Sequence, residues 1–334
     1  MRKLATTRRI EAVEPIPGAD AIEVATVGGW KVVVKKGEFC VDSMAVYLEV
    51  DSWVPQTLAP FLVKSKEPKV YEGIPGERLK TVKLRGQLSQ GLLLPTTVVF
   101  DQDVIPHEGE DVTELLGIVK WERPVPAQLA GQVRGNFPTL IPKTDQERVQ
   151  NLTAEIEAAQ GQRFEVTEKI EGSSMTCYFI HGEFGVCSRN LDLKRDENNS
   201  FWATAIAEDI EAKMKAVDQY WDFAIQGELI GPGIQDNIYK LSKCEFRVFD
   251  VYNVQTGEYL KPEARRALIE RMGLKHVPVL NDAYPLGGDV DYILQTAEGE
   301  SVIANTEREG IVFKQVDGGM TFKAISNLYL LGER

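Results

Sequence analysis

Residues 167–174 read Thr-Glu-Lys-Ile-Glu-Gly-Ser-Ser, and the sequence on either side of them is typical of β-strands. Residues 163–166 alternate between polar and apolar side chains, and residues 175–180 form a second β-rich run. The pattern predicts two strands joined by a turn in which Gly172 can take a positive φ. Lys169 would lie at the mouth of this turn, where it could act as a nucleophile if its surroundings removed its proton. By itself, the stretch also fits the charged tip of an ordinary hairpin.

The composition is that of a globular protein long enough for two domains. The chain has 334 residues, of which 43% are hydrophobic and 26% are charged. No apolar run approaches the ~20 residues that span a bilayer, and the N-terminus lacks the apolar segment of a secretory signal. Four cysteines without C-x-x-C spacing and only three histidines argue against a zinc site or a His-based catalytic triad. We therefore expect a cytoplasmic protein with reduced thiols.

Residues 1–120 are expected to form an OB-like β-barrel that binds nucleic acid. Short candidate strands are separated by Pro-Gly and Gly-Gly turns; they cover residues 21–27, 30–34, 45–50, 79–84 and 91–95. Residues 83–94 are similar to the R-G-x-x-S-x-G-L stretch of OB-fold tRNA-binding modules, although small residues could equally form a tight barrel corner. In a chain of net charge −12, residues 64–85 hold seven Lys or Arg against three Glu. This basic stretch is either a solvated face or a phosphate-binding patch; the candidates for contact are Lys80, Lys83 and Arg85.

Residues 121–143 have the composition of a linker, because they contain four prolines and two glycines. Thr144 and Glu147 have the spacing of a capping box, so we expect a helix to begin there. Residues 144–334 then mix strands with helices predicted at 201–217 and 262–272. Strands and helices do not alternate regularly, which argues against a Rossmann sheet. The pattern favours an α+β domain with antiparallel sheets around a cleft.

Further motifs follow Lys169 in a fixed order: Ser188-Arg189-Asn190, Gly227-Glu228-Leu229-Ile230-Gly231, Phe246–Val251, Glu309–Lys314 and Phe322-Lys323. With E-K-I-E-G, this set resembles the collinear motifs of the covalent nucleotidyltransferases, which include polynucleotide ligases and RNA capping enzymes. It looks most like the ATP-dependent, nick-sealing RNA ligases, over about residues 137–330. The resemblance implies an OB-like barrel followed by a nucleotidyltransferase domain of the ligase (ATP-grasp-like) type, with an ATP cleft between antiparallel sheets.

The resemblance also implies a reaction. An RNA 3′-OH and a 5′-phosphate would be joined through lysyl-AMP on Lys169 and an RNA-adenylate, with ATP as the AMP donor. Lys323 and Lys314 would hold the α-phosphate and lower the pKa of Lys169. Glu309 and Asp250 would hold Mg²⁺ or Mn²⁺, since these ions prefer carboxylate oxygens. The RNA would be a nicked duplex or a broken structured RNA.

Other residues would bind the nucleotide. Phe249 would stack on adenine, while Phe246 would belong to the core, because residues three apart in a strand face opposite sides. Glu228 would accept hydrogen bonds from the ribose, and Arg189 would contact the AMP phosphate or the RNA end. The nucleotide-binding set is completed by the backbone of Glu168, by Glu171 where many relatives have Asp, by Gly172 and by Glu309.

Two departures from the family pattern bear on this interpretation. Some relatives have a second lysine two residues after Lys323, where this chain has Ile325, so the phosphate grip is less cationic or depends on Lys314. The OB-like domain comes before the catalytic motifs, whereas DNA ligases and capping enzymes typically carry theirs after them. This order favours an RNA ligase branch of bacteria or phages, acting in the cytoplasm of the bacterium or the infected host.

Two alternatives remain open at this point. One is a DNA ligase or another lysyl-nucleotidyl transferase. The other is an RNA-binding OB protein whose transferase domain has lost activity. The presence of Lys169, Glu228, Glu309 and Lys323 argues against the second.

Overall fold

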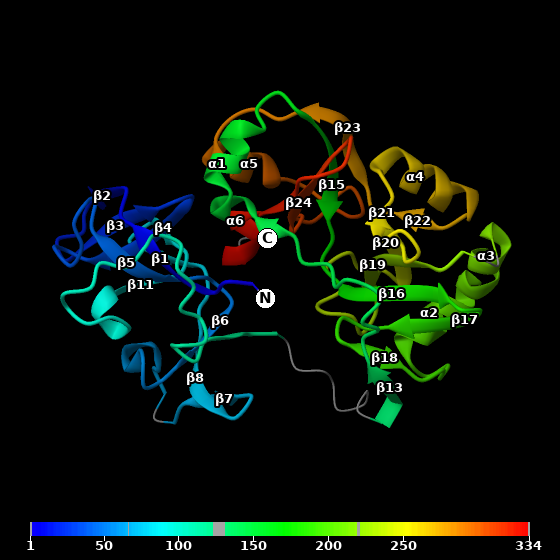
Figure 1. Cartoon of the computed structure of the whole chain (residues 1–334), viewed down its shortest axis with the longest axis horizontal. Coiled ribbons are helices and arrows are strands. Elements are labelled where there is room, and N and C mark those ends of the chain that lie inside the picture. Colours follow the sequence, from blue (N-terminus) through cyan, green and yellow to red (C-terminus); the bar gives the residue numbers. More distant parts are fainter. Residues whose placement is uncertain (1, 66, 123–130, 219–220, 333–334) are drawn as a thin grey trace. The chain divides into compact units, whose positions relative to one another are not determined.

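The computed structural model describes residues 2–65, 67–122, 131–218 and 221–332. The chain forms two compact units (Figure 1). Unit 1 consists of Met1–Pro124 with the short segment Gln150–Thr153, and unit 2 consists of Val125–Val149 with Ala154–Arg334. Within the expected linker, residues 123–130 lie outside the described residues. Residues 133–136 form a strand of unit 2.

Unit 1 is built from short antiparallel strands, and residues 2–65 and 67–122 contain no α-helix. Its strands form the sheets β1-β5-β11, β2-β3-β4, β12-β6-β8-β7 and β9-β10. They are β1 (Ala5–Arg9), β2 (Ala12–Pro15), β3 (Ile22–Val27), β4 (Trp30–Lys35), β5 (Met44–Leu48), β6 (Ser52–Pro55), β7 (Lys69–Tyr71), β8 (Ile74–Arg78), β9 (Val82–Leu84), β10 (Gln87–Ser89), β11 (Leu92–Pro95) and β12 (Val119–Lys120). The strand expected at 79–84 is confirmed only at its end, since residues 79–81 connect β8 to β9.

The core of unit 1 explains the small residues of the stretch 83–94. Ser89 is buried, and its hydroxyl accepts a hydrogen bond from the Val33 amide at 3.0 Å. A Cβ on Gly91 would lie 2.4 Å from the Tyr47 ring, and Gly91 has a φ of +106°. Close packing of the barrel therefore explains both Ser89 and Gly91. This agrees with the alternative in which the small residues of the stretch form a tight barrel corner.

Unit 2 contains two sheets, the first of which has five strands in the order β14-β25-β24-β15-β23. Their bounds are β14 (Glu147–Arg148), β25 (Thr321–Ile325), β24 (Gly310–Gln315), β15 (Arg163–Lys169) and β23 (Val279–Pro285). The rings of Phe164, Phe313 and Phe322 pack together on one face, with Phe313 stacked on Phe322 at 4.6 Å. Helices α1 (Thr153–Ala158), α5 (Val290–Ala297) and α6 (Asn327–Leu331) lie beside this sheet (Figure 1).

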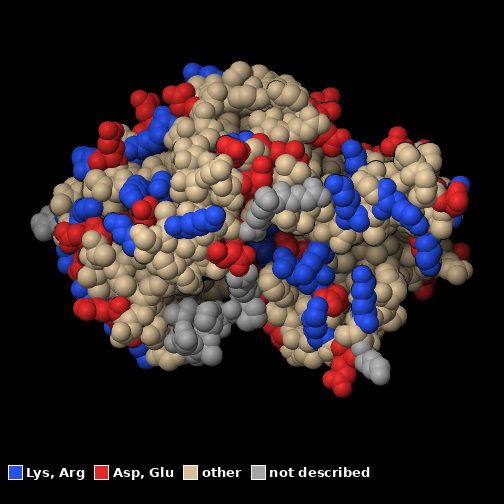
Figure 2. Space-filling model, turned by 180° about the vertical axis from the view of Figure 1, so that it is seen from behind, with Lys and Arg blue, Asp and Glu red and all other residues tan. Residues whose placement is uncertain are grey.

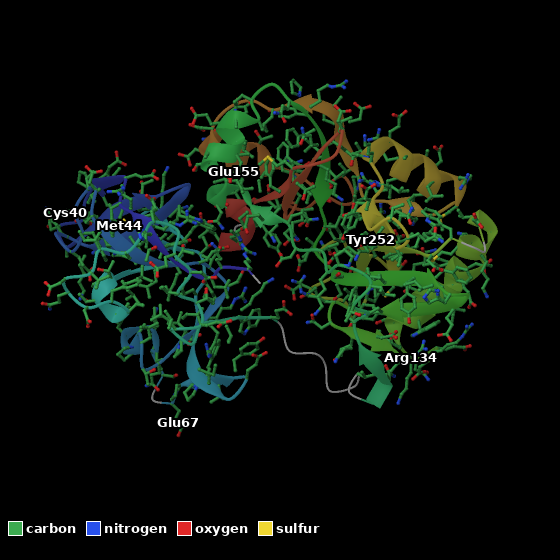
Figure 3. All side chains as sticks on the ribbon, in the orientation of Figure 1. Cys40, Met44, Glu67, Arg134, Glu155 and Tyr252 are labelled. Carbon is green, nitrogen blue, oxygen red and sulfur yellow. The ribbon has the colours of Figure 1, made fainter. Side chains whose placement is uncertain are left out.

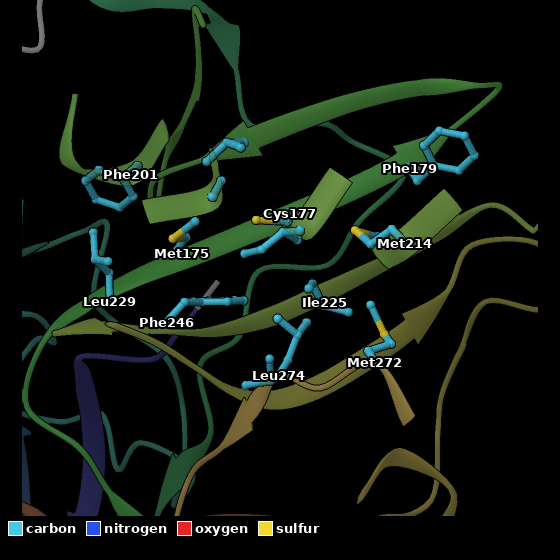
Figure 4. Close-up of a cluster of buried hydrophobic side chains, with 14 of the residues drawn as sticks. Met175, Cys177, Phe179, Phe201, Met214, Ile225, Leu229, Phe246, Met272 and Leu274 are labelled. Atoms are coloured by element: carbon cyan, nitrogen blue, oxygen red, sulfur yellow. The ribbon is translucent and has the colours of Figure 1, made fainter. Parts of the chain in front are cut away.

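The second sheet of unit 2 follows the order β13-β18-β17-β16-β19-β20-β21, with β22 also paired to β20. Its strands are β13 (Val133–Asn136), β18 (Leu191–Leu193), β17 (Glu183–Cys187), β16 (Ser173–Ile180), β19 (Phe223–Ile230), β20 (Glu245–Asn253), β21 (Glu258–Tyr259) and β22 (Lys275–His276). One face packs on the helices α2 (Ser200–Ala207), α3 (Ile210–Val217) and α4 (Pro262–Arg271). This is the core drawn in Figure 4, in which Met175, Phe246 and Leu274 meet.

The other face of this sheet carries the residues of the site. Side chains fill the interior of unit 2, where Tyr252 on β20 lies, whereas Arg134 on β13 lies at the edge (Figure 3). Side chains alternate along a strand. Met175, Leu229 and Phe246 lie on the face that packs on the helices. Thr176, Glu228 and Phe249 lie on the opposite face. The α+β class expected from the sequence is confirmed.

Lys169 does not lie in a hairpin, contrary to the simplest prediction. β15 pairs with β24 and β23, whereas β16 pairs with β17 and β19, so the chain crosses from one sheet to the other at residues 170–172. Gly172 does not adopt a positive φ. It is required because a Cβ there would lie 2.4 Å from the Leu229 carbonyl oxygen. The predicted turn is therefore a tight crossing between sheets.

Two helix predictions also need correction. No helix begins at Thr144; residues 147–148 form β14, which pairs in parallel with β25, and α1 begins at Thr153. The single helix expected at 201–217 is two helices, because Asp209 has a φ of +54° and breaks the run. The helix expected from Pro262 is confirmed as α4.

Candidate active site

Lys169 lies at the end of β15, where the two sheets of unit 2 meet. Its ammonium forms a 2.7 Å ion pair with Glu309, which comes directly before β24. Glu228, on β19 of the other sheet, is close enough for its charge to act on Lys169. Residues of both sheets therefore converge on the lysine, whose side chain remains 27% exposed. Part of the Lys169 side chain is therefore in contact with solvent.

The charges around Lys169 control its protonation. Burial lowers the pKa of Lys169, but the carboxylates of Glu309 and Glu228 outweigh burial and raise the pKa above its ordinary value. Arg148 acts in the opposite direction. Burial, together with Glu309, raises the pKa of Glu228 to about 8 against the charges of Lys169 and Arg189. In this state the lysine is protonated and is not yet a nucleophile.

Lys323 and Arg189 both contact the same acidic residue, Asp145. The Lys323 ammonium lies 3.1 Å from one carboxylate oxygen of Asp145, and the Arg189 guanidinium lies 3.7 Å from the other. Lys323 pairs across β24 with Val312, two residues from the Gly310 that pairs with Lys169. Lys323, expected at the α-phosphate, thus lies near the Lys169 end of the sheet, and Arg189, expected at the AMP phosphate or the RNA end, shares Asp145 with it.

Arg148 is a residue of this site that our sequence interpretation missed. It is 5% exposed, lies on β14 beside Lys323 of β25, and influences the pKa of Lys169. The stretch around it was expected to be a helix that begins at Thr144. The signal that could have found it is the ER pair at 147–148 within a phrase that resembles the lead-in of related ligases.

Lys314, further along β24, and Asp250, on β20 of the other sheet, form a separate pair. The Lys314 ammonium lies 2.6 Å from Asp250 and donates a hydrogen bond to the Phe249 carbonyl oxygen at 2.7 Å. A pocket of about 630 Å³ opens beside this pair, and its lining includes Asp145, Tyr259 and Arg265 but not Lys169. From the sequence, Lys314 and Lys323 were both expected to hold the α-phosphate. In the structure the two lysines have different partners, Asp250 for Lys314 and Asp145 for Lys323.

The two phenylalanines of β20 face opposite sides. Phe246 is completely buried in the core of the second sheet, as predicted. Phe249 is half-buried and packs against a smaller apolar cluster that contains Ile170, Ile230 and Tyr239. Because Ile170 follows Lys169 directly, the Phe249 ring lies beside the residues that connect Lys169 to β16. This position is suited to an aromatic face that a nucleotide base could stack on.

The remaining residues of the Lys169 motif have structural partners. The buried Glu168 carboxylate accepts hydrogen bonds from the Ser301 hydroxyl at 2.5 Å and the Val302 amide at 2.8 Å. The Glu171 amide donates to the Tyr239 hydroxyl oxygen at 2.8 Å. These bonds hold the loop at 301–304 and the residues after Lys169 in place on both sides of the nucleophile.

The expected metal ligands Glu309 and Asp250 are placed apart. Asp250 pairs with Lys314, and Lys314 lies five residues after Glu309, about 16 Å along an extended strand. Among the residues that the structure describes, no three His, Cys, Asp or Glu side chains form a cluster suited to a metal. The carboxylates nearest to Lys169 are instead Glu309 and Glu228.

The basic residues expected to contact nucleic acid project from unit 1. Lys80, Lys83 and Arg85 are exposed and belong to the β9–β10 hairpin or its approach, with Arg85 and Gly86 forming the turn at φ values of +51° and +83°. Two other cations of the stretch are paired, Lys69 with Glu77 and Arg78 with Asp51.

Figure 2 shows several Lys and Arg side chains on the right-hand part of the drawn face, which unit 1 forms. Lys66 lies outside the described residues. Because Lys69 and Arg78 are paired, the basic surface is narrower than the sequence suggested and centres on the hairpin.

Comparison with known proteins gives a consistent result for both units. A family model described as RNA ligase matches residues 162–325, and an OB-fold domain model matches residues 4–96. Solved structures of the Naegleria gruberi RNA ligase are similar over nearly the whole chain. An unliganded mutant is 44% identical, with a TM-score of 0.92, and the match covers 99% of this chain and 98% of that one.

Two liganded structures of the same ligase give similar values. A mutant solved with AMP and Mn is 45% identical, with a TM-score of 0.92 and 98% of each chain covered. A structure with PPi is 45% identical, with a TM-score of 0.91, and covers 99% of this chain and 98% of that one. The comparison with curated proteins gave no match.

These likenesses correct one expectation and confirm the main one. The expected bacterial or phage origin is not supported, because the similar structures come from a eukaryote. No helix in the described ranges is long and apolar enough to cross a membrane. The order of the two matched models, OB fold first, agrees with the two units of the structure. With 44% identity over almost its entire length, the chain belongs to the family of ATP-dependent RNA ligases and carries an OB-fold domain ahead of its ligase domain.

Proposed function

We propose that this chain joins RNA 3′-OH and 5′-phosphate ends with Lys169 as the nucleophile. The amine attacks the α-phosphorus of ATP, a P–N bond forms, and pyrophosphate leaves. The AMP then passes to the RNA 5′-phosphate, and the 3′-OH attacks that phosphorus and releases AMP. The observation that carries this proposal is the convergence of Lys169, Glu309 and Glu228 at one point of unit 2, with Lys323 and Arg189 near it.

The first step requires the neutral amine. Glu309 keeps Lys169 protonated, so its negative charge has to be compensated before attack. Glu228, whose pKa is about 8, adds negative charge only where it is itself deprotonated. The carboxylate oxygens of Glu309 are donors of the kind that Mg²⁺ or Mn²⁺ prefers. Such an ion, when bound with ATP, would neutralise charge on the carboxylates and phosphates. Arg148 contributes in the same direction, because it lowers the pKa of the lysine. We place Glu309, rather than Asp250, at the centre of the metal site, since Asp250 is committed to Lys314.

Phosphoryl transfer depends mainly on position and charge compensation. Lys323, Arg189 and Arg148 are the cations that we assign to the phosphates. Asp145 contacts two of them in the structure, and an incoming phosphate would compete with it for the same donors. The buried Arg148 offsets the absence of a second lysine at Ile325.

We assign the adenosine moiety to the half-buried Phe249 and to Glu228. Phe249 presents its ring beside Ile170, so a stacked adenine would place its ribose toward Glu228 on the adjacent strand β19. The residues next to Lys169 complete the pocket: the backbone of Glu168, together with Glu171 and Gly172.

The RNA is proposed to be a nicked duplex or a broken structured RNA, held in part by unit 1. Exposed Lys80, Lys83 and Arg85 on the β9–β10 hairpin can contact phosphates, and OB folds commonly follow nucleic-acid backbones. The four cysteines are all free, which fits the reducing cytoplasm that we propose as the place of action.

The test is transfer of label from α-labelled ATP to the protein in the presence of Mg²⁺. Wild type should form an acid-labile adduct and seal nicked RNA, whereas Lys169→Ala should do neither while remaining folded. Lys169→Arg should also fail, because a guanidinium stays protonated and cannot attack. Adduct formation by a folded Lys169→Ala protein would remove the nucleophile assignment.

A further inference from the structure

Directly behind Phe249, buried charged side chains join the two sheets of unit 2. Lys314 on β24 and Asp250 on β20 have side chains that are only 6% and 8% exposed, and their charged atoms lie 2.6 Å apart. The same ammonium donates to the Phe249 carbonyl oxygen at 2.7 Å. A single lysine of the first sheet is thus bonded to both the backbone and the next side chain of the strand that carries Phe249.

Arg265 of helix α4 extends this network. Its side chain is 1% exposed, contacts the fully buried Glu165 of β15, and lies 3.7 Å from Asp250. Its Nε donates to His276 Nε2 at 3.0 Å. Since an arginine only donates and a carbonyl oxygen only accepts, His276 carries its proton on Nδ1, 2.6 Å from the Val277 oxygen. Burial and Arg265 lower the pKa of His276 to about 3, which keeps the ring neutral as this arrangement requires.

The position of Lys314 does not suit a phosphate at Lys169. Gly310 pairs with Lys169, and Lys314 is four residues further along β24, about 13 Å at the rise of a strand. Two of the three donors of its ammonium face Asp250 and Phe249. Lys323, opposite Val312, lies nearer to the nucleophile.

The Lys314 ammonium also lies 5.5 Å from the centre of the Phe249 ring. This is within the range of a cation–π contact. Lys314 therefore constrains the backbone and the ring of the same residue. Through these two contacts, Lys314 can fix the position and orientation of the Phe249 ring.

We propose that Lys314 is a positioning residue that, with Asp250 and Arg265, fixes Phe249 for the adenine, and that it does not bind phosphate. This rests on the proposed function, in which Phe249 stacks on adenine. It assigns a role to the ion network of Glu165, Arg265, Asp250 and Lys314, and it separates Lys314 from Lys323.

Comparing ligands with and without phosphate tests the proposal. Binding of ATP and of adenosine is measured by calorimetry and ligand-observed NMR, with every protein in a Lys169→Met background so that no adduct forms. Lys314→Met should weaken ATP and adenosine by the same factor, roughly fivefold or more if base stacking is impaired. Lys323→Met, the matched control, should weaken ATP and leave adenosine unchanged. Adenosine binding that is unchanged in Lys314→Met, with ATP weakened, would overturn the proposal and make Lys314 a phosphate ligand.

A second variant tests the proposal in case Lys314→Met does not fold. Lys314→Met deprives the buried Asp250 carboxylate of its nearest cation, which destabilises a protein. The double variant Lys314→Met, Asp250→Asn removes both charges and should fold, yet it still lacks the donor to the Phe249 carbonyl and should bind adenosine as weakly. Normal adenosine binding by this folded double variant also overturns the proposal.

Phe249→Ala separates this proposal from the function on which it rests. Loss of adenosine binding in Phe249→Ala but not in the Lys314 variants rejects only the role of Lys314. Unchanged adenosine binding in Phe249→Ala rejects the adenine stack itself.

Discussion

At the scale of single residues, the chemistry of Lys169 depends on its two acidic neighbours. Glu309 contacts the ammonium at 2.7 Å, and Glu228 of the other sheet, with a pKa of about 8, adds its charge when it is deprotonated. In the proposed mechanism, this ion pair keeps the lysine protonated and unreactive until positive charge compensates Glu309. Because a divalent ion bound with ATP would supply that charge, this arrangement links the start of the reaction to the binding of both.

Replacing Glu309 should make the lysine more acidic. Only the deprotonated amine is nucleophilic. Glu309 raises the pKa of Lys169, so Glu309→Gln should lower the pKa of Lys169. The pKa can be measured without ATP or metal, from the pH dependence of the NMR signal of ¹³C-methylated Lys169. Glu270→Gln, an exposed change on α4, should leave it unchanged. A Lys169 pKa that stays constant or rises in Glu309→Gln would contradict this account.

The two phenylalanines of β20 should give different phenotypes. Phe246 is fully buried, so Phe246→Ala should lower the free energy of unfolding by about 3–5 kcal/mol. Phe249→Ala should instead weaken ATP use by about 1–3 kcal/mol, on the scale of base–aromatic stacking, and Phe249→Leu should retain part of it. Denaturant unfolding and the ATP dependence of adduct formation measure the two effects. Reversed phenotypes would show that the faces are assigned wrongly.

At the scale of secondary-structure elements, the crossing from β15 to β16 connects Lys169 to the opposite sheet. Only three residues separate Lys169 from β16, so the crossing has to pass close to β19. Gly172 allows this approach, because a side chain there would meet Leu229 and Glu228. The distance between Lys169 and Glu228 therefore depends on the absence of a side chain at Gly172.

Gly172→Ala should disturb this crossing. The added Cβ would lie 2.4 Å from the Leu229 oxygen and 2.8 Å from Glu228 Cγ, so the strands must shift at a cost of about 1–3 kcal/mol. Thermal melting and the rate of adduct formation should both fall. Gly135→Ala, where no heavy atom lies within 4 Å of the new Cβ, should affect neither. Equal behaviour of the two variants would show that the crossing tolerates a side chain.

At the scale of the whole molecule, the two units divide the properties of the chain. The Lys169 site is assembled from unit 2, and the exposed basic hairpin belongs to unit 1. RNA binding and adenylylation should therefore respond to different substitutions. The separation can be measured in the full-length protein.

Reversing the hairpin charges should impair RNA binding and sealing but not the first step. In the variant Lys80→Glu, Lys83→Glu, Arg85→Glu, the salt dependence of RNA affinity should flatten by up to about 0.7–0.9 in slope for each phosphate that the hairpin no longer neutralises. Adduct formation should remain near wild type. The matched control reverses three other lysines of unit 1 with exposed positions: Lys3, Lys35 and Lys36. If the control loses RNA affinity equally, net charge and not the hairpin is responsible. Loss of adduct formation in the hairpin variant would contradict the division between units.

Much of this protein follows from the sequence by itself, for a physical reason. Alternation of side chains along a strand is a local property, so it correctly placed Phe246 in the core and identified the strands expected at 21–27 and 30–34, which are β3 and β4. The order of the motifs indicated the RNA ligase family, because the chemistry requires those residue types around one lysine.

Only the tertiary structure decided which of these residues meet. Local periodicity does not specify the partner of a strand, so the sequence placed β15 and β16 in one hairpin although they belong to different sheets. The same limit explains why Arg148 was assigned to a helix, although β14 brings it beside Lys323, and why Lys314 was grouped with Lys323 rather than with Asp250. These contacts join residues far apart in the chain, and their geometry is set by sheet register and by the close approach at Gly172.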